Sequence, residues 1–177
     1  MSLPRPPGLA KLVIGLITKE KRLFKKAACD LTESYGQIEM VSPWLSFDYT
    51  DYYESEMGAP LFRRVLAFKQ LVEQTALPEI KTITNSLEEK YSRNNKRQIN
   101  IDPGYLLLER FVLATGKNYS HRIYIGKKIY ADLTLIFQKG DFQALPWTYP
   151  DYADRDLLVF LGKVRNKLRI DLKRIKK

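Results

Sequence analysis

The sequence predicts an α+β fold: a ferredoxin-like βαββαβ start, an antiparallel extension of the sheet and a C-terminal helix. Three observations lead to this prediction. The first half of the chain alternates strand and helix periodicity in the order strand, helix, strand, strand, helix, strand. Residues 120–137, SHRIYIGKKIYADLTLIF, then alternate side chains as the two strands of a hairpin do. The last stretch repeats apolar residues every three or four positions, which is typical of an amphipathic helix.

The first half of the chain supplies the alternating elements. Apolar runs predict strands at 11–18, 38–41 and 63–70, and a helix at 19–35 that ends at Gly36. Residues 43–60 interrupt the periodicity with an aromatic and acidic loop, and a loop of this length is usually functional or folded over a site. Pro78 suits the first turn of a second helix. The apolar stripe of that helix is expected at Ile80, Ile83, Leu87 and Tyr91.

The second half predicts strands at 97–102 and 105–115, separated by a turn at Pro103 and Gly104. In the hairpin, a three-residue turn at 126–128 is expected because it keeps the apolar side chains of both strands on one face. Asp154 is the predicted N-cap of the last helix. The hairpin register pairs Arg122 with Asp132 and Tyr124 with Tyr130, and it places His121 on the apolar face.

The chain of 177 residues fits a single domain, expected to span 1–177 with a flexible N-terminal segment at 1–10. Cys29 is the only cysteine, which excludes an internal disulfide and is typical of a reducing compartment. The longest apolar run near the start, at 12–17, is too short to cross a membrane. We therefore expect a cytoplasmic protein with no membrane partner.

The formal net charge of the chain is +10 at pH 7, from 30 basic and 20 acidic residues. Basic residues gather in two clusters, at 11–26 and 163–177, whereas residues 44–58 contain acids and no basic residue. A basic surface can attract nucleic acid, but lysine-rich helix faces also serve simply as solvated surface. Both interpretations stay open.

The acidic loop FDYTDYYESEMG, at 47–58, places Asp48 and Asp51 close together. Neighbouring carboxylates can bind a hard cation such as magnesium, or hold a proton for acid–base chemistry. The spacing matches no calcium loop, because the glycine that such a loop needs at its sharp turn is missing. The alternative is that both aspartates only close the loop by bonding its backbone.

Two further acids and the single histidine are candidates for chemistry. Asp102, in NIDPGY at 100–105, either initiates a turn or faces a site. The Arg122–Asp132 pair is either part of a site or a surface ion pair worth less than about 1 kcal/mol. His121 is either a core residue or a lone general base, and a single histidine excludes a multi-histidine metal centre.

The segment LPWTYPDY, at 145–152, interleaves aromatic residues with prolines and an aspartate. Trp147 and Tyr149 either stack on bases or on a partner, or they clamp this segment onto the core. The composition is similar to that of the acidic loop. We therefore predict that both loops line one cavity, together with Asp102 or the Arg122 face of the hairpin.

These segments, FDYTDYYESEMG, NIDPGY with the SHRIYIGKKIYADLTLIF hairpin, and LPWTYPDY, resemble an uncharacterised prokaryotic family catalogued as domain of unknown function 4416. The resemblance runs from about Lys11 to the last helix. It gives a reason to group the three segments, and it implies no particular substrate.

Three functions are compatible with these residues. The leading hypothesis is a protein that binds a nucleotide or RNA, in which basic side chains hold phosphate and aromatic rings stack on bases. The candidate ligand-binding residues are Arg64, Arg97, Arg122, Lys127, Lys128, Tyr124, Tyr130, Trp147 and Tyr149. The alternative is a metal-dependent enzyme of phosphate chemistry, with a divalent cation such as magnesium. Its candidate catalytic residues are Asp48, Asp51, Asp102, Asp132 and His121. The third hypothesis is a protein-interaction module. A phosphate-binding loop is absent, because Gly116-Lys117 lacks both the earlier glycine and the following Ser or Thr.

Overall fold

The computed structural model describes residues 3–175 of the chain, apart from the side chain of Asp51. Residues 3–9 of the predicted flexible segment form neither helix nor strand, and residues 1–2 lie outside the described residues. The strands are β1 (Ala10–Thr18), β2 (Ile38–Val41), β3 (Leu45–Phe47), β4 (Leu61–Val72), β5 (Ile99–Leu106), β6 (Arg110–Thr115), β7 (Arg122–Gly126), β8 (Ile129–Gln138) and β9 (Asp141–Ala144). The α-helices are α1 (Lys21–Tyr35), α2 (Glu54–Met57), α3 (Leu77–Lys90) and α4 (Arg155–Ile175), and short 3-10 helices are η1 (Asp51–Tyr53), η2 (Gln74–Ala76) and η3 (Pro150–Tyr152).

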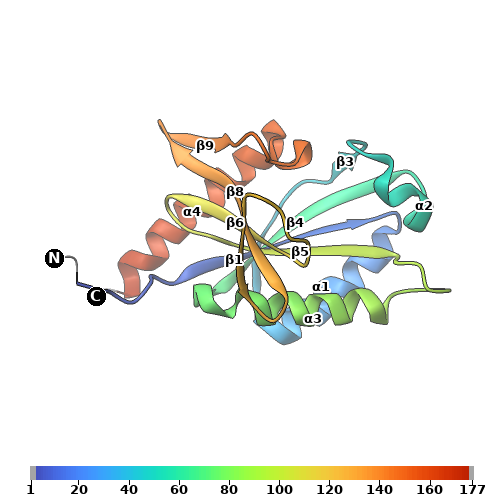
Figure 1. Ribbon diagram of the computed structural model, residues 1–177, viewed down its shortest axis with the longest axis horizontal. Helices are drawn as coiled ribbons and strands as arrows, with labels where there is room; N and C mark the ends of the chain where they lie inside the picture. The colour runs from blue at the N-terminus through green and yellow to red at the C-terminus, as the bar shows by residue number, and fades with distance from the viewer. Residues whose placement is uncertain (1–2, 176–177) are drawn as a thin grey trace.

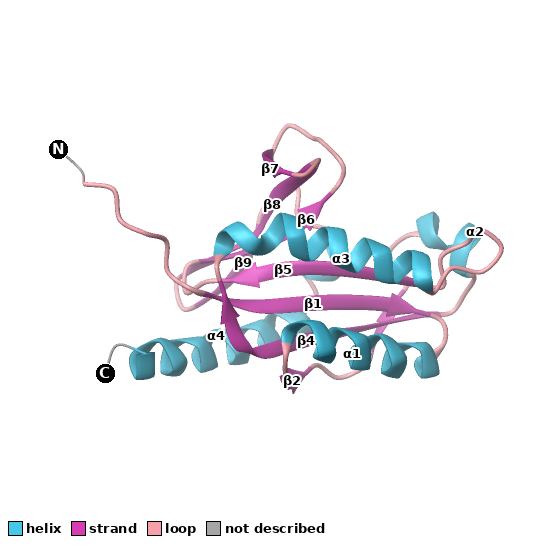
Figure 2. Cartoon of the chain, turned by 90° about the horizontal axis from the view of Figure 1, so that it is seen from below, coloured by secondary structure: helices cyan, strands magenta, loops and turns pink. Residues whose placement is uncertain are grey.

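The fold is a mixed α+β arrangement with one large antiparallel sheet and a C-terminal helix, as predicted (Figure 1). The sheet order is β2-β4-β1-β5-β6-β8-β7, with β3 beside β4 and β9 beside β8. Helices α1 and α3 cover one face of the sheet, and α4 covers the other (Figures 1 and 2). No helix within residues 3–175 is long and apolar enough to cross a membrane.

Strand β1 is buried along its whole length, because helices cover both faces of the sheet around it. Leu12, Ile14 and Leu16 pack toward α1 and α3. Val13 points to the other face and packs in a second core, to which Val164 of α4 also belongs. The period-2 alternation of the strand thus assigns each side chain to one of two cores.

Strand β5 runs straight through Pro103 and Gly104, so the predicted turn at this pair is wrong. Pro103 lies opposite Ile14 of β1, and the chain turns only after Leu106. Strand β6 pairs with β5 from Gly104 to Leu106 and no further. A proline is tolerated in a strand where its missing N–H would face no strand partner. The two strands therefore separate at the proline.

The predicted hairpin pairs are confirmed: Arg122 lies opposite Asp132, and Tyr124 lies opposite Tyr130. The predicted face of His121 is wrong. Its Nε2 lies 3.2 Å from Oδ2 of Asp132, the same oxygen to which Nε of Arg122 donates over 2.9 Å. The residue precedes β7, so the alternation of the strand does not determine where its side chain points.

The predicted three-residue turn of the hairpin is also wrong. Gly126, and not Ile125, lies opposite Ile129, so the register shifts by one residue just before the turn. Lys127 and Lys128 form the two-residue turn, with φ angles of 51° and 61°. Two adjacent positive φ angles match the right-handed twist of hairpin strands, and a bulge at the glycine absorbs the extra residue.

The predicted apolar stripe of α3 is confirmed in part: Ile80 is buried, and Leu87 and Tyr91 pack against the same core, but a polar stripe beside them is buried as well. Ile83, Leu87 and Tyr91 are only half-buried. The buried residues of the helix are Leu77, Pro78, Ile80, Lys81, Thr84 and Glu88. The apolar residues of α3 pack in the core, and its buried polar residues form a separate stripe.

Lys11, counted with the first basic cluster, is fully buried and is not part of a basic surface. Its ammonium group pairs with Glu39 of β2 and lies 2.8 Å from Oδ2 of Asp171 in α4. Lys167 of α4 pairs with the same two acids. This buried network connects the edge of the sheet to the last helix.

Candidate functional site

A cavity of about 480 Å³ lies where β5 and β6 separate. Its lining comes from the ends of β1 and β3, from the loop and η1 that follow β3, from β4, α3, β5 and β8, from the end of β6, and from η3 with the residue before it. The prediction that residues 47–58 and 145–152 line one cavity with Asp102 is therefore confirmed.

Arg63 of β4 lies at the floor of the cavity and is only 1% exposed. Its guanidinium group pairs with Asp151 of η3 and lies 3.6 Å from Oδ2 of Asp102. The ring centres of Tyr152 and Phe47 lie 4.1 and 5.7 Å from its central carbon. A buried cation is stable only where acids and aromatic faces replace its hydration. These four neighbours supply that replacement.

Gly15 of β1 makes room for this group. A Cβ atom at position 15 would lie 3.1 Å from Oη of Tyr152 and 3.3 Å from Nη2 of Arg63. Both Tyr152 Oη and Arg63 Nε are buried and have no hydrogen-bond partner within the described residues. Burial raises the pKa of Tyr152, which keeps its hydroxyl protonated. The floor therefore contains a buried hydroxyl and a guanidinium N–H whose hydrogen bonds are unmade.

The carboxylate of Asp102 faces the cavity, and its side chain is 25% exposed. Its Oδ2 accepts a hydrogen bond from Nδ2 of Asn100 over 2.7 Å. Its Oδ1 lies 4.0 Å from Nζ of Lys81 and accepts no hydrogen bond from the part of the chain that is described. The protein thus holds one oxygen of this carboxylate and leaves the other open to the cavity.

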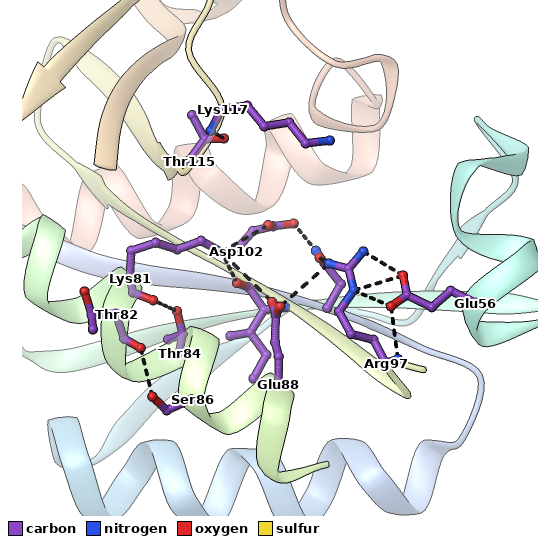
Figure 3. Close-up of polar contacts among 12 residues, drawn as sticks. Glu56, Lys81, Thr82, Thr84, Ser86, Glu88, Arg97, Asp102, Thr115 and Lys117 are labelled. Atoms are coloured by element: carbon purple, nitrogen blue, oxygen red, sulfur yellow. Dashed lines mark hydrogen bonds and ion pairs between the residues drawn. The ribbon is translucent and has the colours of Figure 1, made fainter. Parts of the chain in front are cut away.

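Two side chains of α3 form the hydrogen bonds to the backbone of β5 that a neighbouring strand would otherwise form (Figure 3). Oε1 of Glu88 accepts a hydrogen bond from the N–H of Ile101 over 2.6 Å, and Nζ of Lys81 donates to its carbonyl over 2.9 Å. The N–H and C=O of one residue in an antiparallel strand point toward the same neighbouring strand, and residues two apart point to the same side. Ile101 and Pro103 therefore both face the side of β5 where no strand pairs with it. Burial raises the pKa of Glu88 even though Lys81 lies nearby. The polar inner face of α3 therefore completes the edge of β5.

Arg97 joins the acidic loop to the floor of the cavity (Figure 3). Its Nε and Nη2 donate to the carboxylate of Glu56 over 3.0 and 2.8 Å, and its Nη1 donates to Asn100 over 3.1 Å. The hydrogen bonds between Arg97 and Glu56 raise the pKa of Arg97 and lower the pKa of Glu56. Burial, together with the Asp102 carboxylate, raises the pKa of Tyr53, another lining residue. The bidentate pair of Arg97 and Glu56 fixes α2 beside the cavity.

Lys117 lies just after β6, on the far side of the cavity from the Lys81–Asp102–Arg97 row (Figure 3). Its Nζ donates to Oη of Tyr52 over 3.1 Å and lies 4.5 Å from the centre of that ring. The hydrogen bond lowers the pKa of Tyr52. Lys117 forms no ion pair with any residue that the structure describes. It is thus a cation at the mouth whose charge is not matched by any carboxylate among the described side chains.

Asp132 lines the cavity on the side of β8 and is 3% exposed. Its Oδ2 lies beside Nε2 of His121 and accepts a hydrogen bond from Nε of Arg122. Nη2 of Arg122 donates in turn to Oη of Tyr149 over 2.7 Å. The ring of Trp147 stacks on His121 with ring centres 4.9 Å apart. This row of contacts positions Tyr149 at the rim of the cavity.

A comparison with protein families links the chain to one of them. The model of the family described as "Domain of unknown function (DUF4416)" matches residues 8–168. The chain belongs to this family. The match includes every residue that lines the cavity of this DUF4416 protein. The comparisons with curated proteins and with solved structures found no match.

The structure brings part of the predicted site together. Arg97, Asp102, Asp132 and Tyr149 line the cavity. His121, Arg122 and Trp147 contact Asp132 or one another just outside the lining.

Other predicted site residues lie away from the cavity. Asp48 is exposed and does not line it, and the side chain of Asp51 lies outside the described residues. Arg64 points to the opposite face of the sheet, where it lies over the rings of Trp44 and Phe24. Tyr124 and Tyr130 pack against each other on the hairpin, Lys127 pairs with Glu79, and Lys128 belongs to the hairpin turn. In the described part of the chain, no group of three or more His, Cys, Asp or Glu side chains is placed to hold a metal ion.

Sequence reasoning missed several lining residues, and two of them left a detectable pattern. Leu61, Arg63 and Val65 alternate along β4 on the buried face, so the parity of the strand assigns Arg63, and not Arg64, to the interior. Lys81 is four positions after the apolar Leu77, so the helical period places both on the same inner face of α3. No comparable pattern indicates Asp151 or Tyr152, because their positions depend on how η3 docks.

Proposed function

We propose that the protein binds a mononucleotide in this cavity, with the base against the tyrosines at the mouth and the phosphate at Lys117. The observation that carries the proposal is the combination, around one cavity, of several aromatic rings with a cation that has no carboxylate partner in the described chain. Aromatic rings stack on any base, and an unpaired cation attracts phosphate.

The dimensions and the lining of the cavity support a small ligand. A volume of about 480 Å³ falls within the usual range of small-molecule sites. Tyr49, Tyr52 and Tyr149 are each 40% exposed or more, so their rings are available at the mouth. Phe47 and Tyr53 lie deeper. A flat base can therefore reach a ring face without a change in the core.

The distribution of charge supports the same orientation. Among residues 3–175, four cations line the cavity. Arg63 and Lys81 lie close to Asp102, and Arg97 is held by Glu56, so their charges are already matched. Lys117 remains. A phosphate is therefore stabilised best at the mouth.

The basic residues of α1 favour a nucleotide over an RNA strand as the ligand of this cavity. Lys21, Arg22, Lys25 and Lys26 are exposed, but none of them lines the cavity. A strand held by this cluster would leave the tyrosine-lined cavity unused. A metal-dependent enzyme is the second candidate, because Asp102 and Asp132 line the same cavity. Turnover of a nucleotide that requires magnesium would favour it.

Isothermal titration with adenosine and uridine monophosphates tests the proposal, using the wild-type protein and Tyr52→Ala. Loss of one stacking ring costs about 1–3 kcal/mol per base, so we expect the variant to bind between about fivefold and a hundredfold more weakly. Tyr52→Phe retains the ring and should retain most of the affinity.

Tyr119→Ala is the matched control, because Tyr119 is 66% exposed and does not line the cavity. We expect its affinity to equal that of the wild-type protein. If Tyr52→Ala binds as tightly as the wild-type protein, the base does not lie at the tyrosines and the proposal is wrong.

We also propose that the elements up to β5 form a ferredoxin-like unit and that the protein acts in the cytoplasm. The first proposal is supported by the order β2-β4-β1-β5, in which every neighbouring pair is antiparallel, and by α1 and α3 lying on one face. The second is supported by the single cysteine, Cys29, which is exposed and unpaired in the described structure.

A further inference from the structure

The floor of the cavity differs chemically from its mouth. At the floor, Asp102, Asp151 and Glu88 surround Arg63 and Lys81, so that acids accompany every cation. A phosphate placed there would face carboxylates and lose most of its hydration. The floor therefore accepts an uncharged polar group.

Three polar atoms at the floor make no hydrogen bond to the described residues, and they define that group further. Oδ1 of Asp102 can only accept a hydrogen bond, Nε of Arg63 can only donate one, and Oη of Tyr152 can do either. Burial keeps the hydroxyls of Tyr152 and Tyr53 protonated by raising the pKa of each. A hydroxyl group is uncharged and both donates and accepts, so it matches this set of atoms.

We infer that Asp102 accepts a hydrogen bond from a sugar hydroxyl, and that the ligand is a ribonucleotide whose 2′- and 3′-hydroxyls point to the floor of the cavity. This inference rests on the proposed function. In a ribonucleotide the base and the 5′-phosphate project from one face of the ribose, and both hydroxyls project from the other. Hydroxyls at Asp102 therefore leave the base and the phosphate directed to the mouth, where Tyr52 and Lys117 lie.

The surrounding contacts hold Asp102 in this role. Asn100 occupies Oδ2 with one N–H, and the carbonyl of the same amide accepts a hydrogen bond from Arg97, which fixes its orientation. The oxygen that remains for the ligand is Oδ1. A site built around a hydroxyl discriminates strongly against an analogue that lacks it, because its buried polar groups are then left unpaired.

Titration of the full chain with paired ligands tests the inference. The probes are adenosine and uridine monophosphates, their 2′-deoxy counterparts and ribose 5-phosphate. We expect each deoxynucleotide to bind at least about tenfold more weakly than its ribonucleotide, because a hydrogen bond to a charged group is lost. We expect Asp102→Asn to weaken ribonucleotide binding by about tenfold or more and to reduce the ratio between the two sugars.

Asp141→Asn is the matched control, since Asp141 is exposed on β9 and its substitution changes the net charge by the same amount. Thermal unfolding of each variant establishes that it is folded. The comparison of the two sugars on the wild-type protein needs no variant, so the inference can be tested even if Asp102→Asn does not fold.

The possible outcomes separate the inference from the proposed function. Equal affinity for ribonucleotides and deoxynucleotides would overturn the inference and leave nucleotide binding intact. Binding of ribose 5-phosphate that depends on Asp102, without binding of any nucleotide, would support the sugar site and overturn base stacking. If none of the probes binds at millimolar concentration, both are wrong.

Discussion

At the scale of single residues, the site depends on which positions of an otherwise apolar strand carry a polar side chain. Arg63 and Arg64 are adjacent, yet one is buried under the cavity and the other lies on the opposite face of the sheet. The alternation of β4 is sufficient to assign them, because Leu61 and Val65 belong to the buried face. The partners of Arg63 could not be predicted in the same way. Asp102 comes close to Arg63 through the strand order β4-β1-β5, and Asp151 through the docking of η3.

Substitution of Gly15 tests how tightly this group is packed. A Cβ atom would enter the space beside Tyr152 and Arg63, and extra atoms in a well-packed interior cost about 1–3 kcal/mol. We expect Gly15→Ala to lower the free energy of unfolding by this amount in urea denaturation.

Gly162→Ala provides a control of opposite sign. Gly162 lies within α4, and a Cβ atom there would meet nothing within 4 Å. Alanine favours a helix over glycine by up to about 1 kcal/mol, so this variant should be slightly more stable than the wild-type protein. Equal stability of Gly15→Ala and the wild-type protein would mean that the floor can move to accept a methyl group.

At the scale of elements, the sequence predicts most strands and helices but not the gap in the sheet. Periodicity identifies α1, the hairpin and α4, whose predicted N-cap Asp154 accepts hydrogen bonds from two N–H groups of the first turn. Pro103 and Gly104 indicate a turn in the sequence because these residues commonly form one. In the structure, Pro103 ends the pairing of two strands without ending β5, a result that depends on what lies beside the strand.

The contact between α3 and β5 predicts a dependence of stability on pH. Burial raises the pKa of Glu88 above its ordinary value of 4.5, so the folded chain holds this proton at pH values where the unfolded chain has released it. The contribution is fully present below pH 4.5 and is lost as the pH rises through the folded pKa. We expect Glu88→Gln, which cannot titrate, to lack this loss. Urea denaturation across this range should therefore show the variant gaining stability relative to wild type as the pH rises.

Glu89→Gln is the control for this measurement, because Glu89 is the next residue of α3 and is exposed. Its stability curve should run parallel to that of the wild-type protein. A difference between Glu88→Gln and wild type that stays constant with pH would contradict the assigned protonation of the buried carboxyl group.

At the scale of the whole molecule, the two basic clusters lie on different faces of the sheet. The first is on α1 and the second on α4, and these helices are separated by the strands (Figure 2). Composition and net charge could not reveal this separation, since they contain no information about which face each helix covers. They also could not reveal that Lys11 is buried between acids.

The separation of the clusters makes nucleotide and RNA binding experimentally independent. We expect the double substitution Lys25→Glu and Lys26→Glu to leave nucleotide affinity unchanged, because exposed substitutions away from a site change free energies by less than about 0.5 kcal/mol. Single-stranded RNA held by α1 should bind the same variant more weakly. The slope of log affinity against log salt should flatten by about 0.7 for each phosphate that the variant no longer neutralises.

Fluorescence anisotropy with a labelled RNA over a range of salt concentrations measures the second effect. Absence of RNA binding to the wild-type protein at low salt would show that the basic face of α1 is only solvated surface. A loss of nucleotide affinity in the double variant would instead show that the cavity and α1 act together.

Two side chains, and not a neighbouring strand, form hydrogen bonds with the backbone of Ile101. This arrangement affects how the size of the cavity can vary. In an ordinary sheet, the width between two strands is set by backbone hydrogen bonds and cannot be altered by replacing side chains. Here the backbone of β5 at Ile101 is bonded by Lys81 and Glu88 of α3. Longer or shorter residues at these two helix positions would move α3 toward or away from β5 while the strand order stays the same. The size of the cavity can therefore change through two positions on one helix.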